Sequence, residues 1–161
     1  MMTESEKIRL FRSLFRGRED VFAKRFESQK TGRSGYAPAC ANEWREGICA
    51  KPKVKCADCP NRQFLPVTDA ITRSHLIGYD DRRRPLVIGV YPLLPSETCW
   101  FLAVDFDKQD WQKDALAYLN TCRENQISAA LERSRSGNGG HVWIFFAEEV
   151  PAATARNLGA S

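Results

Sequence analysis

Hydrophobic residues near the N-terminus recur every three to four positions, which is the spacing of one face of a helix. This pattern runs over residues 10–15 and follows Thr3-Glu4-Ser5-Glu6, a capping-box sequence that marks the start of a helix. The apolar residues between positions 21 and 26 have a similar spacing and predict a second helix that ends near Ser28. The front of the chain is therefore expected to be helical.

Further along, short apolar runs predict strands and longer periodic segments predict helices. A strand over 100–106, a helix over 111–125 and a strand over 127–132 follow one another. Such a run predicts a pair of parallel strands joined by a right-handed crossover. The other predicted elements are helices over 69–76 and from 151 onward, and strands over 86–91 and 142–146.

The composition is that of a folded protein, with 161 residues, 43% of them hydrophobic, and no low-complexity tract. This length suits one domain with at most a small appended module. No run of about 18 apolar residues is present, so we expect no membrane span. The charged residues 1–7 do not resemble a signal peptide, and we expect a cytoplasmic location.

The charge is unevenly distributed, although the net charge is only +4. Residues 1–84 contain 18 Lys or Arg and 11 Asp or Glu, a balance of +7, whereas residues 85–161 contain 6 and 9, a balance of −3. A basic front half suits a polyanionic partner such as nucleic acid. An ordinary solvated surface explains the same charges equally well.

Four of the six cysteines fall within one short segment of the basic half: Cys40, Cys49, Cys56 and Cys59. Four thiolates can hold Zn²⁺ in a closed tetrahedral site, whose role is structural because no open position remains. The Cys-x2-Cys pair is typical of a zinc knuckle, but the spacing of the first pair is less so, and unliganded thiols are the alternative. Cys99 and Cys122 lie in apolar stretches and are expected to be core thiols.

The stretch from Trp100 to Asp107 has the pattern of a buried strand that ends in two carboxylates. Side chains alternate across a strand, so Asp105 and Asp107 should point to one side while Phe106 points towards the core. Adjacent carboxylates repel each other unless a cation lies between them, and Mg²⁺ or Mn²⁺ is held in this way together with substrate phosphates. We therefore predict a divalent-metal site at this strand end.

A Ser/Gly-rich segment between Arg133 and His141 connects two predicted strands. A long hairpin turn would account for it. Its serine hydroxyls, arginines and glycine N–H groups are also suited to bind an anion such as a triphosphate. The candidate nucleotide-binding residues are Arg135, Ser136, Gly137, Gly139 and His141.

Two segments resemble catalytic motifs of the archaeo-eukaryotic primase superfamily. Leu102-Ala-Val-Asp-Phe-Asp107 resembles its first motif, hydrophobic-Asp-hydrophobic-Asp, and Ser134-Arg-Ser-Gly-Asn-Gly-Gly-His141 resembles its second, which ends in a phosphate-contacting His. The strings Gly-Tyr-Ala-Pro-Ala-Cys-Ala-Asn-Glu-Trp and Lys-Cys-Ala-Asp-Cys-Pro-Asn-Arg are similar to the primase domain of TOTE conflict systems. The resemblance covers roughly residue 15 to the end of the chain.

This resemblance implies an α+β fold, with a partial RRM-like primase catalytic core over 67–161 and an N-terminal helical and four-cysteine zinc-knuckle region over 1–66. It implies a DNA-directed primase or polymerase that acts in DNA replication. The expected partners are a nucleic-acid template, nucleoside triphosphates and a helicase, and the expected cofactors are Mg²⁺ or Mn²⁺ and structural Zn²⁺.

The resemblance also assigns roles to site residues. Asp105 and Asp107 would hold the catalytic metals, and His141 would contact the triphosphate as the third catalytic residue. The family's third acidic motif is expected beyond residue 161, because the acidic residues at 148–149 follow His141 too closely. We therefore expect an incomplete site that is inactive alone.

Two other functions fit the same residues. A non-catalytic zinc-containing module that binds nucleic acid would use the carboxylates structurally. A metal-dependent nuclease would use paired aspartates and a histidine for phosphodiester hydrolysis. For a protein that binds a nucleic-acid template, Trp44 and Tyr36 are candidates to stack on bases, although burial beside the zinc site equally suits Trp44.

Overall fold

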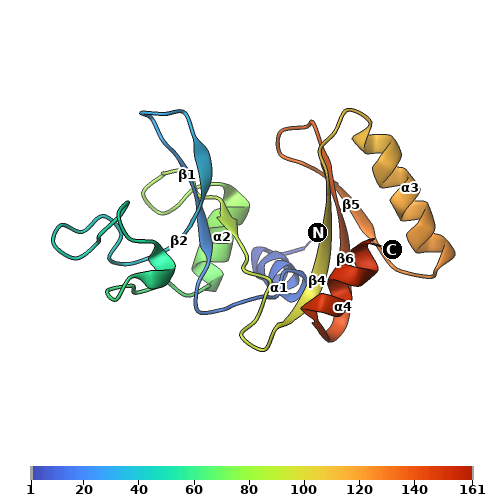
Figure 1. Cartoon of the computed structure of the whole chain (residues 1–161), viewed down its shortest axis with the longest axis horizontal. Helices are drawn as coiled ribbons and strands as arrows, with labels where there is room; N and C mark the ends of the chain where they lie inside the picture. The colour runs from blue at the N-terminus through green and yellow to red at the C-terminus, as the bar shows by residue number, and fades with distance from the viewer. Residues whose placement is uncertain (1, 161) are drawn as a thin grey trace. The chain divides into compact units, whose positions relative to one another are not determined.

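The structure is a computed structural model that describes residues 2–160. These residues contain four α-helices and two small antiparallel sheets, which confirms the expected mixture of α and β structure (Figure 1). The chain divides into two compact units. Unit 1 comprises the chain up to Ser13 together with Gly17–Tyr91, and unit 2 comprises Leu14–Arg16 together with the chain from Pro92 onward. The expected regions 1–66 and 67–161 stay a prediction.

Unit 1 is built around a three-stranded antiparallel sheet with the strand order β2-β1-β3. Phe22, Leu86 and Ile88 belong to its buried apolar cluster, against which Ile71 packs. The elements of this part of the chain are α1 (Glu4–Leu14), β1 (Ala23–Glu27), β2 (Ser34–Pro38), the short 3-10 helix η1 (Cys56–Asp58), α2 (Asp69–Ile77) and β3 (Ile88–Gly89).

The helix predicted over residues 21–28 is wrong, because most of this segment forms strand β1. Its partner β2 pairs with it along its whole length, and β2 was hidden in the sequence by Gly35 and Pro38. The ring of Phe26 lies over Gly35, where an added Cβ would be 3.1 Å from the ring. The glycine that suggested a loop thus makes room for an aromatic side chain between paired strands.

Both predicted helix starts in unit 1 are confirmed by their caps. The Thr3 N–H donates to Glu6 Oε2 at 2.7 Å and the Glu6 N–H donates to Thr3 Oγ1 at 3.3 Å, which is a capping box. The Oγ1 of Thr68 accepts from the Ile71 N–H at 3.2 Å at the start of α2, and Gly78 ends this helix with φ of 88°. Each of these cap hydrogen bonds joins residues three positions apart, so the sequence alone could indicate both helix starts.

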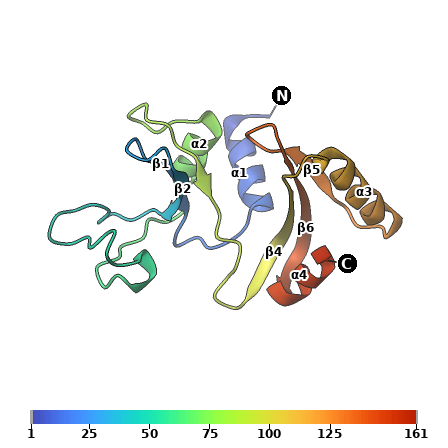
Figure 2. The same ribbon diagram turned by 45° about the horizontal axis from the view of Figure 1, so that its top comes forward.

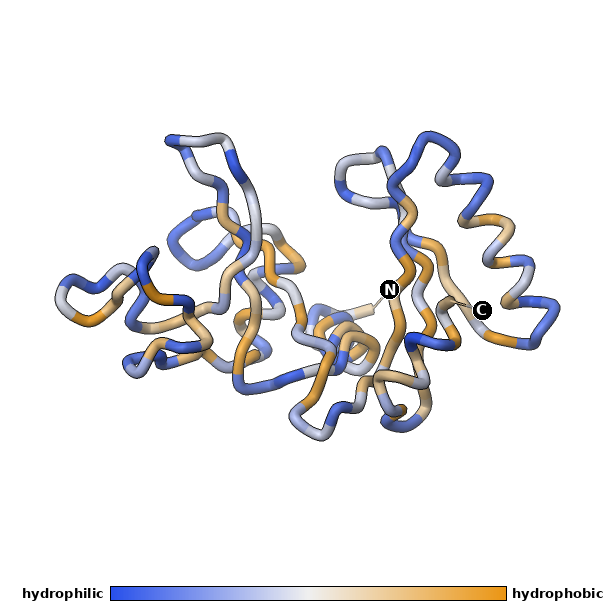
Figure 3. The backbone as a smooth tube through the Cα atoms, viewed as in Figure 1, coloured by the Kyte–Doolittle hydropathy of each residue, from blue (hydrophilic) through white to orange (hydrophobic). Residues whose placement is uncertain are grey.

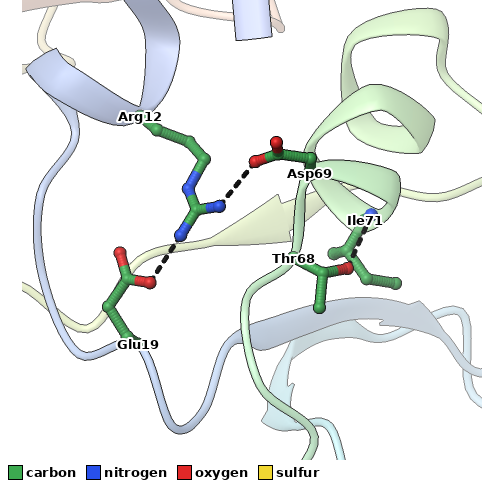
Figure 4. A network of polar contacts seen from close by, with 5 residues as sticks. All are labelled: Arg12, Glu19, Thr68, Asp69 and Ile71. Atoms are coloured by element: carbon green, nitrogen blue, oxygen red, sulfur yellow. Dashed lines mark hydrogen bonds and ion pairs between the residues drawn. The ribbon is translucent and has the colours of Figure 1, made fainter. Parts of the chain in front are cut away.

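One arginine joins three segments of unit 1, as Figure 4 shows. The Arg12 guanidinium on α1 donates to Asp69 Oδ1 at 2.6 Å and to Glu19 Oε2 at 2.5 Å. Asp69 is the first residue of α2, and Glu19 precedes β1. The side-chain hydrogen bond to Asp69 is the main reason why the pKa of Arg12 is raised.

Unit 2 contains the second antiparallel sheet, with the strand order β4-β6-β5 (Figures 1 and 2). The predicted parallel pair is wrong: β4 and β5 run in the same direction, but β6 lies between them and pairs with both. The hairpin loop over 134–139 reverses the chain after β5 and inserts β6 at this central position. The elements are β4 (Thr98–Phe106), α3 (Trp111–Glu124), β5 (Ala130–Arg133), β6 (Gly140–Pro151) and α4 (Ala152–Ala160).

The two faces of the unit 2 sheet differ in what covers them. On one face Val142 packs with Trp111 and Ala115 of α3, and α4 approaches Leu102 so closely that a Cβ on Gly159 would be 3.0 Å away. The other face carries an aromatic cluster that Phe15 joins. Figure 3 shows that the apolar stretches of β4 and β6 give way to hydrophilic turns at the loop end of the sheet.

Within residues 2–160, none of the helices is both long and apolar enough to cross a membrane.

Candidate functional site

Three polar side chains lie in a row across the unit 2 sheet, close to its loop end. His141 on the central strand is the register partner of Asp105 on one side and of Glu132 on the other. Directly opposed residues of antiparallel strands share one face of the sheet. The Nε2 of His141 is accordingly 3.5 Å from Asp105 Oδ1, and its Nδ1 is 3.6 Å from Glu132 Oε2.

Asp107 stands just past the end of β4, on the same end of the sheet as this row. Asp105 and Asp107 are both exposed, and the Asp105 side chain retains 66% of its exposure. Because Asp107 lies outside the strand, the alternation of side chains no longer fixes its direction. That the Asp105 and Asp107 side chains point to the same side therefore stays a prediction.

The Ser/Gly loop over 134–139 is held together by its own hydrogen bonds. The Ser134 N–H donates to the Gly139 carbonyl, and the Gly137 N–H donates to the Ser134 carbonyl, both at 2.9 Å. The Ser134 and Ser136 hydroxyls are 3.1 Å apart. The N–H of Gly137, one of the predicted anion ligands, is therefore already engaged within the loop.

The two arginines of this segment differ in their surroundings. The guanidinium of Arg133 folds over the loop and donates from Nε and Nη2 to the Gly137 carbonyl at 3.2 and 3.1 Å. Arg135 is exposed at the loop tip, where its guanidinium can reach a ligand. Arg135 is thus the better placed of the two cations to contact an anion.

Two glycines bring the loop against the end of β4. A Cβ on Gly139 would lie 2.7 Å from the Phe106 carbonyl oxygen and 3.4 Å from the Asp107 Cα. A Cβ on Gly140 would lie 2.6 Å from the Trp111 ring. Only glycine allows this approach, so the loop returns to the sheet directly beside the strand end that carries the aspartates.

Glu132 is the site residue that the sequence reasoning missed. Its Oε2 accepts from the indole N–H of Trp143 at 2.8 Å and faces His141. Neither Glu132 nor Trp143 is part of a recognisable motif. A usable signal was the hairpin itself, because a turn centred between positions 136 and 137 pairs Glu132 with His141 across β5 and β6.

The chain matches a known family along almost its whole length. The family model of the TOTE conflict system archaeo-eukaryotic primase domain matches residues 6–161. The chain belongs to this family. A comparison with curated proteins found no match. Membership in a primase family indicates nucleotidyltransferase-type chemistry and interaction with nucleic acid and nucleotides.

The donor set of this primase domain fits a hard divalent cation at the end of β4. Asp105 and Asp107 offer carboxylate oxygens, which Mg²⁺ and Mn²⁺ prefer, and their exposure leaves room for water and phosphate oxygens. No ready-made group of three or more His, Cys, Asp or Glu ligands occurs among residues 2–160. A metal ion here would depend on the two aspartates and on oxygens from outside the chain.

The four clustered cysteines of the primase domain lie in unit 1 and line one small cavity of about 20 Å³. The Gln63 N–H donates to Cys40 Sγ at 3.3 Å, as backbone N–H groups do to the thiolates of structural zinc sites. The chemistry of this set fits Zn²⁺. Among the described residues, these thiols do not form a group of three or more side chains arranged to hold a metal ion. Zinc at the four cysteines therefore stays a prediction.

Lys51 lies against the same cavity and makes an ion pair with Glu43 at 2.7 Å. Burial alone would lower the pKa of Lys51, but its hydrogen bond to Glu43 and the nearby Cys56 outweigh burial, so the pKa is raised. The Lys51 ammonium group is therefore positively charged beside the cysteines. Cys99 and Cys122 are buried, as predicted, and burial raises the pKa of both thiols.

Proposed function

We propose that this chain is a primase/polymerase-type nucleotidyltransferase domain with an RRM-like core in unit 2. In this proposal Asp105 and Asp107 hold Mg²⁺ or Mn²⁺, and the loop that leads into His141 holds a nucleoside triphosphate. The observation that best supports this proposal is the pairing of β4 with β6, which sets Asp105 opposite His141 with Asp105 Oδ1 3.5 Å from His141 Nε2. The loop packs onto the end of β4 beside them.

The roles of the side chains follow from their chemistry. The bound metal would supply charge stabilisation for the attacking hydroxyl and the leaving pyrophosphate. Arg135 and the Ser136 hydroxyl donate to phosphate oxygens, and the imidazole Nε2 of His141 does so when it carries a proton. Gly139 keeps the phosphate loop close to the aspartates because it has no side chain.

Unit 1 would serve the nucleic-acid template. Cys40, Cys49, Cys56 and Cys59 would hold a structural Zn²⁺ that fixes their surrounding loops. Trp44 and Tyr36 are 66% and 56% exposed, which supports base stacking over burial for both rings. The excess of Lys and Arg in residues 1–84 supplies phosphate contacts.

Synthesis on a template separates this proposal from its competitors. The longest natural protein that contains the chain is incubated with single-stranded template, nucleoside triphosphates and Mn²⁺. We expect new strands that are lost in Asp105→Ala and retained in the control Asp114→Ala, which removes an exposed carboxylate of α3.

Two results would contradict the proposal. Strand cleavage without synthesis, lost in Asp105→Ala, indicates a metal-dependent nuclease. Binding of nucleic acid without any chemistry, unaffected by Asp105→Ala, indicates a non-catalytic binding module.

A further inference from the structure

The carboxylate of Glu132 is held in one place by Trp143. The Trp143 indole N–H donates to Glu132 Oε2 at 2.8 Å. The indole is itself fixed by aromatic neighbours: its ring centroid is 5.0 Å from that of Phe15, 5.7 Å from that of Phe101 and 6.3 Å from that of Phe145. The Glu132 side chain is exposed, but its Oε2 is anchored at the sheet face by this hydrogen bond from a packed ring.

The same oxygen faces a buried nitrogen of His141. The Nδ1 of His141 is inaccessible to solvent and has no hydrogen-bond partner among the described residues. Glu132 Oε2 lies 3.6 Å away, so a shift of roughly 0.5 Å completes a hydrogen bond of ordinary length. An unpaired lone pair on Nδ1 would face a carboxylate and could not be solvated, whereas an N–H on Nδ1 would be satisfied by it.

We propose that Glu132 is a positioning residue for His141: it accepts the Nδ1–H of the imidazole and so fixes the ring with Nε2 facing Asp105 and the incoming phosphate. In this arrangement Nε2 donates to the phosphate when the ring carries both protons, and Nδ1–H stays on Glu132 in either state. Trp143 supports this role by holding Oε2, and the fixed ring needs no reorientation when a nucleotide enters. The tautomer assignment stands on the geometry alone. Its consequence for nucleotide binding rests on the proposed function.

The chain offers a built-in reference for the test, because it contains only two histidines. The Ile88 N–H donates to Nδ1 of His75 at 3.3 Å, so His75 must carry its neutral-state proton on Nε2. The two rings are therefore expected in opposite tautomers. Proton–nitrogen correlation spectra of the ¹⁵N-labelled chain, recorded at alkaline pH, distinguish the two neutral tautomers directly.

We expect the Nδ1–H form for His141 in the wild-type chain and a shift towards the Nε2–H form in Glu132→Ala. Glu132→Gln should retain the wild-type form, because its amide oxygen still accepts a hydrogen bond. The control Glu148→Gln, an exposed carboxylate elsewhere on β6, should leave both rings unchanged. His75 lies in the other unit and should keep its tautomer throughout, which gives an internal reference signal.

The nucleotide arm measures the dissociation constant of a Mn²⁺–nucleoside triphosphate. We expect this dissociation constant to rise about tenfold in Glu132→Ala, the lower end of the loss found when a residue that orients a metal-bound histidine is removed, and to stay near wild type in Glu132→Gln. Trp143→Phe keeps the aromatic packing but removes the indole N–H donor. This variant should therefore raise the dissociation constant as well.

The tautomer measurement and the nucleotide-binding measurement test different parts of the proposal. An Nε2–H form of His141 in the wild-type chain, or a tautomer unmoved in both Glu132→Ala and Trp143→Phe, overturns the positioning role. Unchanged nucleotide affinity in Glu132→Ala overturns its functional consequence. A wild-type chain that binds no nucleotide contradicts the proposed function, while the tautomer measurement still decides the role of Glu132.

Discussion

The two histidines of the chain hold their Nδ1 atoms in opposite environments. The Nδ1 of His75 accepts from the backbone N–H of Ile88, whereas the Nδ1 of His141 faces a carboxylate oxygen of Glu132. The first nitrogen needs a lone pair and the second needs a proton. One neighbouring group is thus sufficient to favour opposite tautomers in the two rings.

His75 should make the stability of the chain depend on pH. Burial lowers the pKa of His75 from 6.5, so the unfolded chain binds this proton more readily than the folded chain. Its contribution is fully present above about pH 6.5 and is lost as the pH falls towards the lowered pKa of the folded state. We expect the free energy of unfolding, measured by urea titration, to fall more steeply with acidification in the wild type than in His75→Gln. Parallel pH profiles for the two proteins would contradict this.

The residue patterns could indicate Asp105, Asp107 and His141, because unusual polar residues stood out against apolar strands. They could not indicate Glu132, which resembles any exposed acidic residue until the register of β5 and β6 is known. Nor could they show that the Gly137 N–H is engaged inside the loop. Side-chain chemistry is visible along the sequence, but hydrogen-bond partners depend on pairing in space.

At the scale of elements, capping signals were more informative than hydrophobic spacing. The ends of α1 and α2 follow from side chains at the caps, which act within three or four residues. The spacing of apolar residues over 21–26 is compatible with a helix as well as a strand, and the choice is made by pairing with β2. A hairpin over 134–139 predicts that β6 pairs with β5, but the hydrophobic pattern does not show that β6 also pairs with β4 and so separates β4 from β5.

The Arg12 network should contribute measurably to the stability of unit 1. Arg12→Met keeps much of the apolar stem but removes both charged hydrogen bonds, to Glu19 and Asp69. We expect a loss of about 1 kcal/mol in the free energy of unfolding, because the Arg12 side chain is only 29% exposed while both partners are largely solvated. The control Arg9→Met changes an exposed residue of the same helix and should have a smaller effect. Equal losses in the two variants would argue against the network.

At the scale of the whole molecule, the charge asymmetry follows the division into units. Residues 1–84, with a balance of +7, belong to unit 1 apart from Leu14–Arg16, and both site aspartates belong to unit 2. This separation supports a division of labour in which unit 1 contacts a polyanion and unit 2 holds a cation.

Zinc should be part of the folded protein. We expect about one equivalent of Zn²⁺ per purified chain and a marked loss of metal and stability in Cys56→Ser. Cys122→Ala serves as the control, because this buried thiol lies outside the cysteine cluster and should retain zinc. Less than about half an equivalent, with Cys56→Ser folding normally, would exclude a structural zinc site.

In the proposed site, Asp105, Asp107 and His141 surround one metal ion with its bound nucleotide. The most direct test adds Mn²⁺ and a nucleoside triphosphate to the ¹⁵N-labelled chain and maps the paramagnetic broadening of backbone amide signals. We predict that broadening centres on these three residues and on the loop over 134–139, persists in Asp114→Ala and disappears in Asp105→Ala. Broadening centred elsewhere in the chain, or undiminished in Asp105→Ala, would contradict the claim.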